Sequence, residues 1–457
     1  MRRIIEPVDT AETVKKSALE IGFDLAGVAP VDAAPDLAFA RQWVESGRGG
    51  EMRYLANPKR DDPRLILPSA RSVVCVGLIY NAPLPYSTEC AQGHEEASEP
   101  RGWISRYAWG RDYHEVMRVK LERLRQEMDS LAPGVETRVY VDTGPIVERA
   151  FARLSGIGWV GKNTCLINQQ KGSWFFLGVI LSNLALKPDL PAPDRCGSCT
   201  RCIEACPTEA LAPYVMDASR CIAYLTIELK GSIPEEFRAA IGNNIFGCDI
   251  CQDVCPWNSP AVNGKPSAGG GPHRSRRGPA TTNEPEFQPL NIPAALRSVD
   301  GGSVTGKNAE AGIPGLSNSL TPETSHLEPT RISLFNPPLR ALASMTEGDF
   351  RRAFSHSPIK RAKYRGWLRN LCVAIGNSGS PSFIPWLQST AQHHDQLVRE
   401  HAAWALKRLA KVEAGFRFRV SERKPRSPRL HESRIYNELH KSAMVIYCSG
   451  GLWPPVF

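Results

Sequence analysis

Seven cysteines in two runs carry the most specific chemistry in this sequence. The first run is Cys196-x2-Cys199-x2-Cys202-x3-Cys206-Pro207, and the second is Cys248-x2-Cys251-x3-Cys255-Pro256. In the two-cluster iron–sulfur pattern with these spacings, three cysteines of one run hold a [4Fe–4S] cluster, and the cysteine before proline binds the other cluster. Ile245 stands where the second run would have its first ligand, so this run is one cysteine short.

Cys221 is the only cysteine between the two runs, and we predict that it is the missing ligand. One cluster would then be held by Cys196, Cys199, Cys202 and Cys255, and the other by Cys206, Cys221, Cys248 and Cys251. Structural zinc and disulfides remain alternatives, since paired C-x2-C motifs also suit zinc. The two C-x3-C steps that end in proline favour iron–sulfur.

The composition predicts a cytoplasmic protein of two or three domains. The chain has 457 residues, of which 42% are hydrophobic, and no apolar run approaches the ~18 residues of a membrane span. The basic start MRRII leads into polar residues rather than the apolar segment of an export signal. The cysteines outside the cluster set (Cys75, Cys90, Cys165, Cys372 and Cys448) indicate a reducing compartment, where disulfides are rare.

Positive charge is concentrated in one segment. The formal net charge is +9, and residues 331–430 hold 19 Lys and Arg against 6 Asp and Glu. Such a local excess is typical of a surface that binds a polyanion. A solvated basic surface without a specific partner would look the same, because attraction to phosphate does not depend on base sequence.

The first 190 residues alternate strand-like and helix-like stretches, which favours an α/β or α+β domain. We expect strands at 72–80, 138–141 and 174–182, and a helix at 114–131 with apolar residues at helical spacing. Asp142 follows the second strand in a Asp-Thr-Gly-Pro turn and could face a pocket. An Asx turn or a helix N-cap would explain the same aspartate without catalysis.

The domain plan expected from the whole chain has five parts. Residues 1–188 form the N-terminal domain, and 189–262 form a two-[4Fe–4S] ferredoxin-like domain, with a helix near 234–241. Residues 263–326, rich in Gly, Pro, Ser, Thr and Asn, form a linker or disordered insertion. Residues 327–413 form an all-α domain whose similar stretches at Arg369 and Arg399 suggest HEAT-like helices, and 414–457 form a tail.

Six stretches together resemble the epoxyqueuosine reductase family. They are NPKRDDPRLILP around Arg60, YAWGRDYH at 107–114, DTGPIVER at 142–149, GIGWVGKN at 156–163, LTIELKG at 225–231 and GNNIFGCDICQDVCPWN at 242–258. The resemblance covers about residues 10–260 and resumes from about 327 to 412. It implies an enzyme that reduces the epoxide of a modified wobble base in tRNA, the last step of queuosine synthesis. It also implies a cobalamin bound in the N-terminal domain beside two [4Fe–4S] clusters.

The same resemblance implies the roles of individual residues. Asp142 matches the proton donor, and it would need a raised pKa to act as an acid near pH 7. The expected cobalamin contacts are Arg60, Ser105, Asp142, Leu166 and Leu177, and Ser105 stands where some relatives carry a cysteine. The expected tRNA contact from the resemblance is Arg238, and its neighbour Lys230 is a further candidate. Arg361 and Arg365 are expected tRNA contacts because they belong to a basic cluster, with Lys360, Lys363 and Arg369, that could grip phosphates or could be a solvated helix face. The electron donor is not identified.

Two other functions fit parts of the sequence. A corrinoid reductive dehalogenase also pairs a corrin with two clusters, but Arg2-Arg3 lacks the apolar region of the twin-arginine signal that such enzymes usually carry. A ferredoxin-like electron carrier or nucleic-acid-binding module would need the clusters or the basic helices alone. The basic C-terminal segment favours a nucleic acid substrate over the dehalogenase.

Overall fold

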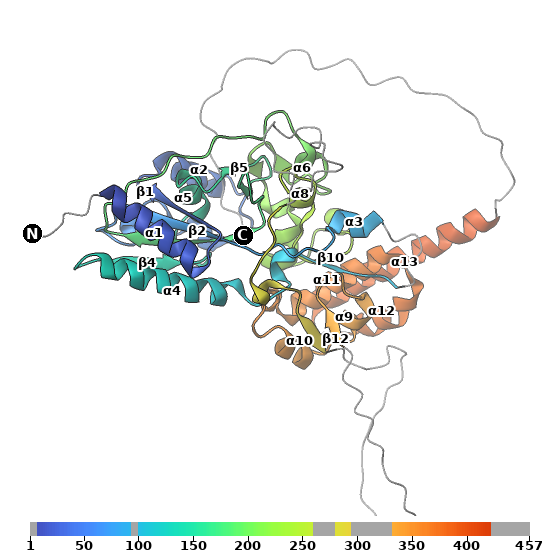
Figure 1. Cartoon of the computed structure of the whole chain (residues 1–457). Coiled ribbons are helices and arrows are strands. Elements are labelled where there is room, and N and C mark those ends of the chain that lie inside the picture. Colours follow the sequence, from blue (N-terminus) through green and yellow to red (C-terminus); the bar gives the residue numbers. More distant parts are fainter. Residues whose placement is uncertain (1–6, 93–98, 259–278, 294–330, 422–457) are drawn as a thin grey trace, which may run out of the picture.

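The computed structural model describes residues 7–92, 99–258, 279–293 and 331–421 (Figure 1). A sheet with helices on both faces forms one side of the molecule. Next to it lies the part that holds the two cysteine runs, residues 196–255, here called the cysteine segment, and the C-terminal helices lie against this segment. In these ranges, no helix is long and apolar enough to cross a membrane.

The N-terminal part is built on a four-stranded antiparallel sheet. Its strands are β1 (Leu25–Pro30), β2 (Ser72–Ile79), β7 (Phe175–Ser182) and β4 (Thr137–Tyr140), in that order across the sheet. Every residue of β2 is buried, as expected for a strand covered on both faces. The three predicted strands are confirmed. The antiparallel pairing makes this part α+β, which is one of the two classes expected.

Two helix layers sandwich the sheet. Helices α1 (Pro7–Ile21) and α4 (Tyr113–Leu131) pack on one face, and α2 (Ala34–Glu45) and α5 (Glu148–Leu154) pack on the other. The helix predicted at 114–131 is confirmed, and its Met117, Leu121, Leu124 and Met128 are fully buried. Asp112 caps the N-terminus of α4 by accepting a hydrogen bond from the backbone N–H of His114.

The cysteine segment consists of short elements. They are α6 (Arg201–Glu204), β8 (Leu211–Ala212), β9 (Val215–Met216), the π-helical turn η6 (Tyr224–Glu228), α7 (Glu235–Arg238), β10 (Asn244–Phe246) and α8 (Ile250–Asp253). Strand β10 pairs in parallel with β3 (Trp103–Ile104), which joins this segment to the N-terminal part. Strands β5 (Trp159–Val160) and β6 (Leu166–Ile167) pair with each other, and α3 (Ser87–Gln92) lies against α8. The helix expected near 234–241 is present as α7.

The C-terminal part is mainly helical and shares a core with earlier residues. Its helices are α9 (Leu339–Ala343), α10 (Glu347–Ala353), the 3₁₀ helix η9 (Pro358–Ala362), α11 (Lys363–Ser378), α12 (Ile384–Thr390) and α13 (Gln396–Ser421). The similar stretches at Arg369 and Arg399 lie on α11 and α13, which pack together. Trp103, Trp109 and Phe246 share one apolar cluster with Trp367 and Leu371. The C-terminal helices therefore complete a core that begins before residue 110.

The expected linker at 263–326 is wrong for residues 279–293. Phe287 is 2% exposed and packs in the core of the N-terminal part, and β11 (Asn291–Pro293) pairs with β12 (Arg331–Ser333). The polar composition of the whole stretch hid a few apolar residues that find partners far away in sequence. The rest of the expected linker lies outside the described residues. The expected tail begins later than 414, because α13 extends to Ser421.

Candidate active site

A pocket opens between the sheet and the cysteine segment. It encloses about 1420 Å³ of space, part of it open to solvent. Its wall includes Phe175 and Phe176 of β7, Ile146 in the loop after β4, and Cys221, Cys248 and Cys251 of the cysteine segment. All five residues expected to contact the cofactor also line it: Arg60, Ser105, Asp142, Leu166 and Leu177. The fold thus brings residues from all six of the stretches named above to one cavity.

Asp142 occupies a strained turn at the edge of this pocket. Its φ is 55°, in the left-handed region that Asp adopts more readily than most residues. The backbone N–H of Thr143 donates to the carbonyl of Val141 at 2.5 Å, and the N–H of Asp142 donates to Glu148 Oε1 at 2.7 Å. Such a conformation costs about 1–3 kcal/mol and persists only where neighbours hold it. Its cost is consistent with a functional position.

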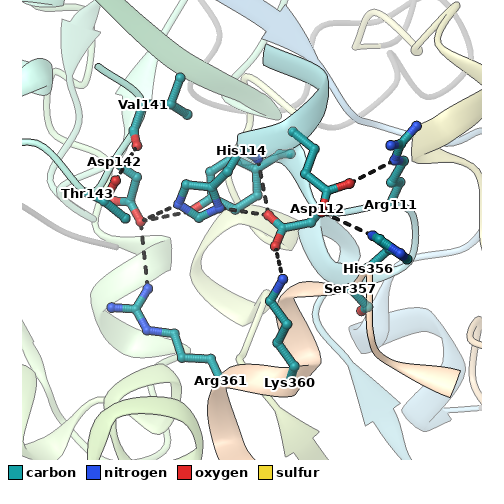
Figure 2. Close-up of polar contacts among 12 residues, drawn as sticks. Arg111, Asp112, His114, Val141, Asp142, Thr143, His356, Ser357, Lys360 and Arg361 are labelled. Atoms are coloured by element: carbon teal, nitrogen blue, oxygen red, sulfur yellow. Dashed lines mark hydrogen bonds and ion pairs between the residues drawn. The ribbon is translucent and has the colours of Figure 1, made fainter. Parts of the chain in front are cut away.

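Three groups surround the carboxylate of Asp142 (Figure 2). The hydroxyl of Tyr113 donates to Oδ2 at 2.8 Å, His114 Nε2 lies 3.5 Å from it, and Arg361 Nη1 lies 3.6 Å from it. Burial acts to raise the pKa of Asp142, but the hydrogen bonds from His114 and Tyr113 and the charge of Arg361 outweigh it. The pKa of Asp142 therefore lies below its ordinary value. An acid near pH 7 would need a raised pKa, and this arrangement lowers the pKa of Asp142 instead.

His114 holds the opposite charge. Its Nδ1 lies 2.7 Å from Oδ1 of Asp112, and Lys360 Nζ lies 2.8 Å from the other oxygen of that carboxylate. Burial acts to lower the pKa of His114, but hydrogen bonds with Asp112 and Asp142 raise it to about 9. At neutral pH the imidazole is therefore protonated beside an ionised Asp142.

Glu148, directly behind Asp142, is a different kind of carboxyl group. Burial and the negative charge of Asp142 raise the pKa of Glu148 to about 8. Two carboxyl groups in one pocket thus have opposite protonation states near pH 7, a separation typical of acid–base sites. Arg361 connects this network to a third carboxyl group, because its Nε lies 2.6 Å from Glu228 Oε1. Glu228 belongs to η6, and π-helical turns are frequent at functional sites.

Sequence reasoning missed the part that His114, Glu148 and Lys360 play here. His114 and Glu148 lie in two of the stretches that resemble the family, YAWGRDYH and DTGPIVER. These stretches drew attention to the two residues, but the sequence alone indicated no chemical role for either of them. Lys360 and Arg361 come from η9 in the C-terminal part, and only the tertiary fold brings them to Asp112 and Asp142. Ser105 lines the pocket, but its hydroxyl donates to Asp249 at 2.5 Å.

The cysteines gather in the two sets predicted from their spacing. Cys196, Cys199, Cys202 and Cys255 line one small cavity, together with Lys162 and Trp257. In the other set, Cys221, Cys248 and Cys251 line the active-site pocket. Burial raises the pKa of Cys248, and the nearby thiols of Cys221 and Cys206 raise it further, so Cys206 lies near these cysteines. The backbone N–H groups of Lys162 and Ala210 donate to Cys196 and Cys206 Sγ at 3.4 and 3.3 Å.

The disulfide alternative finds no support in the described part of the chain, because every cysteine there is a free thiol. Cys165, which sequence reasoning set aside, also lines the pocket and shares a hydrogen bond with Cys251 that lowers the pKa of Cys165.

The residues expected to contact tRNA lie in different environments. Lys230 and Arg365 are exposed, and Arg365 pairs with Asp395 at 2.8 Å. Arg238 is 4% exposed and pairs with Glu400. Arg369 is 1% exposed and donates to backbone carbonyls of Leu225, Leu229 and Gly231. Arg369 therefore joins α11 to the cysteine segment, and the phosphate grip expected of it is wrong in this structure.

Comparison with known proteins agrees with the site. A family model described as a 4Fe-4S double cluster binding domain matches residues 195–258, and one described as epoxyqueuosine reductase QueG, DUF1730 matches residues 60–143. The epoxyqueuosine reductase of Xanthomonas campestris is 37% identical over 405 residues, covering 88% of this chain and 96% of the relative. That of Pseudomonas aeruginosa is 36% identical and covers 88% of this chain and 95% of the relative.

Solved structures give the same result. A crystal structure of epoxyqueuosine reductase with an epoxyqueuosine-modified tRNA-Tyr stem loop has a TM-score of 0.64 and 29% identity, covering 91% of this chain and 94% of that one. The Bacillus subtilis enzyme, in a structure whose catalytic aspartate loop is swung out of the active site, has a TM-score of 0.63 and 28% identity, covering 90% and 94%. The identity to curated relatives over 88% of this chain, together with the double-cluster domain, shows that this chain belongs to the epoxyqueuosine reductase family.

Proposed function

We propose that this chain reduces epoxyqueuosine to queuosine at the wobble position of tRNA in the cytoplasm, with Asp142 passing a proton to the departing oxygen. One observation carries the proposal: a single pocket exposes the Asp142 carboxylate and three cysteines of the second cluster set to the same space. Electrons and a proton can therefore reach one substrate group. The relative from Bacillus subtilis also has a catalytic aspartate loop.

The composition of the pocket wall supports cobalamin as the cofactor. Its wall combines aromatic and aliphatic side chains such as Tyr107, Phe176 and Leu177 with a few charged groups, the mixture typical of cofactor sites. Arg60, Ser105, Asp142, Leu166 and Leu177 would hold the cofactor. When bound, the cobalt of a corrin supplies a strong reductant that can collect electrons delivered one at a time.

The reaction itself explains why a proton source is needed. Conversion of an epoxide to an alkene takes two electrons and two protons and releases the oxygen as water. Oxygen is a poor leaving group unless it is protonated as its bond to carbon breaks. The clusters would be held by Cys196, Cys199, Cys202 and Cys255 and by Cys206, Cys221, Cys248 and Cys251. These clusters would receive electrons from a donor that is not yet identified.

The basic C-terminal part supports tRNA as the substrate. Lys230 and Arg365 are exposed and could contact the phosphate backbone, which positions a nucleic acid without reading its sequence. The wobble base would have to leave its stack to enter the pocket, as in other enzymes that modify bases. Arg238 would contact tRNA only if its pair with Glu400 opened. Arg361 is more suited to the pocket, since it pairs with Asp142 and Glu228.

The test is turnover by anaerobically reconstituted protein with cobalamin, a chemical reductant and tRNA that carries epoxyqueuosine. Digestion and mass analysis of the nucleosides should show the loss of one oxygen mass. The Asp142→Asn variant should keep its cobalamin and iron but lose turnover, whereas Leu190→Ala, at an 88% exposed position, should match the wild type. Unchanged epoxyqueuosine in the wild-type reaction, with both cofactors bound, would refute the proposed function.

A further inference from the structure

Asp142 must receive a proton before it can deliver one to the epoxide oxygen. The proposed donor is ionised in the resting site, because His114, Tyr113 and Arg361 hold the pKa of Asp142 below its usual value despite its burial. An ionised carboxylate has no proton to give. The proton for the epoxide oxygen must therefore be stored on a neighbour that can pass it to Asp142.

His114 is the neighbour with the right geometry. Its Nε2 faces Asp142 Oδ2 at 3.5 Å and has no closer hydrogen-bond acceptor, while its Nδ1 is held by Asp112 at 2.7 Å (Figure 2). With Nδ1–H bound to a buried carboxylate, the second proton of the imidazolium sits on Nε2, 3.5 Å from Asp142 Oδ2. Asp142 lines the pocket and His114 does not, so His114 lies behind Asp142 as seen from the pocket.

We propose that His114 stores the proton that Asp142 delivers, and that η9 of the C-terminal part completes this relay by holding Asp112 and Asp142 in place. This inference rests on the proposed function and adds to it a positioning residue and a role for the C-terminal helices. In the step, His114 Nε2 gives its proton to Asp142 Oδ2 and becomes neutral, and Asp142 gives its proton to the oxygen leaving carbon. The relay thus supplies one of the two protons, and His114 regains a proton from water before the next transfer.

The groups that face His114 agree with this role. On its own helix, Asp112 binds Nδ1, and the ring of Tyr113 stacks on the imidazole at 4.1 Å. Asp142 comes from the loop after β4, and the buried Glu148, which is neutral near pH 7, is the first residue of α5. From η9, Lys360 pairs with Asp112 at 2.8 Å and Arg361 approaches Asp142 at 3.6 Å (Figure 2). Lys360 thus pairs with Asp112 and Arg361 with Asp142, and His114 lies between these two carboxylates.

The first measurement does not depend on turnover. In protein with oxidised clusters and without cobalamin, labelled with ¹³C in the histidine rings, the His114 signal is identified by its absence from His114→Gln among the ten histidines. We expect its titration midpoint near the pKa of about 9, and a lower midpoint in Asp112→Asn, because Asn keeps the N-cap but removes the charge. A His114 midpoint at or below the ordinary value of about 6.5 would overturn the proposal.

The second measurement is the single-turnover rate against pH. His114→Gln should be about 100-fold slower than wild type at pH 7.5, the lower end of typical losses of a proton-transfer group, with unchanged iron, cobalamin and tRNA affinity. The wild-type rate should fall as pH rises through about 9, and in Asp112→Asn this fall should begin at lower pH. If His114→Gln does not fold, the shifted profile of Asp112→Asn tests the same relay.

The matched control is His356→Gln, which removes an imidazole that is 71% exposed and contacts Glu115 rather than Asp142. It should leave the rate and the pH profile unchanged. Equal rates and profiles in His114→Gln and wild type would refute the relay while leaving the proposed function intact. A wild-type protein that does not reduce epoxyqueuosine would refute the proposed function, and the titration would still decide whether His114 stores a proton.

Discussion

Phe287→Ala tests whether residues 279–293 belong to the core that supports the site. The ring is 2% exposed and meets Phe176 edge to face at 5.1 Å, and Phe176 in turn stacks on Tyr113 at 4.3 Å. Removing a buried phenylalanine costs about 3–5 kcal/mol, because the lost apolar contact leaves a cavity. With a urea dependence of ~3 kcal/mol per M, the unfolding midpoint should fall by about 1 M or more.

The assay is anaerobic urea unfolding followed by tryptophan fluorescence, with clusters intact at the start. Leu190→Ala is the control, because Leu190 is 88% exposed and such surface changes stay within about 0.5 kcal/mol. The variant should also turn over more slowly at equal folded fraction, since Tyr113, which donates to Asp142, loses its support through Phe176. If Phe287→Ala unfolds at the same urea concentration as Leu190→Ala, residues 279–293 do not belong to the core.

Two further predictions concern the clusters and the pH dependence of stability. Cys221→Ala should lose about half of the bound iron, because it removes one ligand from one of the two cysteine sets, whereas Cys165→Ala should keep all of it; iron loss in Cys165→Ala instead would make Cys165 the eighth ligand. His401 donates from Nδ1 to the carbonyl of Leu397 at 2.8 Å, and its Nε2 accepts from the N–H of Ile233 at 3.2 Å. These two contacts require the neutral ring. Burial and the charge of Arg238 lower the pKa of His401 to about 4. Because the pKa of His401 is lower in the folded than in the unfolded protein, its contribution to the free energy of unfolding is complete above about pH 6.5 and is lost as pH falls towards 4. Between pH 7.5 and 5.5, the free energy of unfolding measured in urea should fall by about 1 kcal/mol through this residue. In His401→Leu this component should vanish, and an unchanged pH dependence there would contradict the assignment.

Several elements of the fold could be predicted because their signals are local. The run from Ser72 to Tyr80 is apolar throughout, and the spacing of Met117, Leu121, Leu124 and Met128 matches one face of a helix. Local signals failed where the partners were distant. Phe287 stands in a polar, proline-containing stretch, and only its packing against β7 makes it part of the core.

The cysteine spacing predicted iron–sulfur chemistry, because ligands within one short loop fall close together whatever the rest of the chain does. The sequence also predicted Asp142 as a candidate site residue, because it lies in a turn directly after a strand. It could not determine the protonation of Asp142, since the pKa of a carboxylate depends on which charges lie within a few ångströms. Those charges come from α4 and from η9, far along the chain, and only the tertiary structure decided that Asp142 is ionised beside a protonated His114.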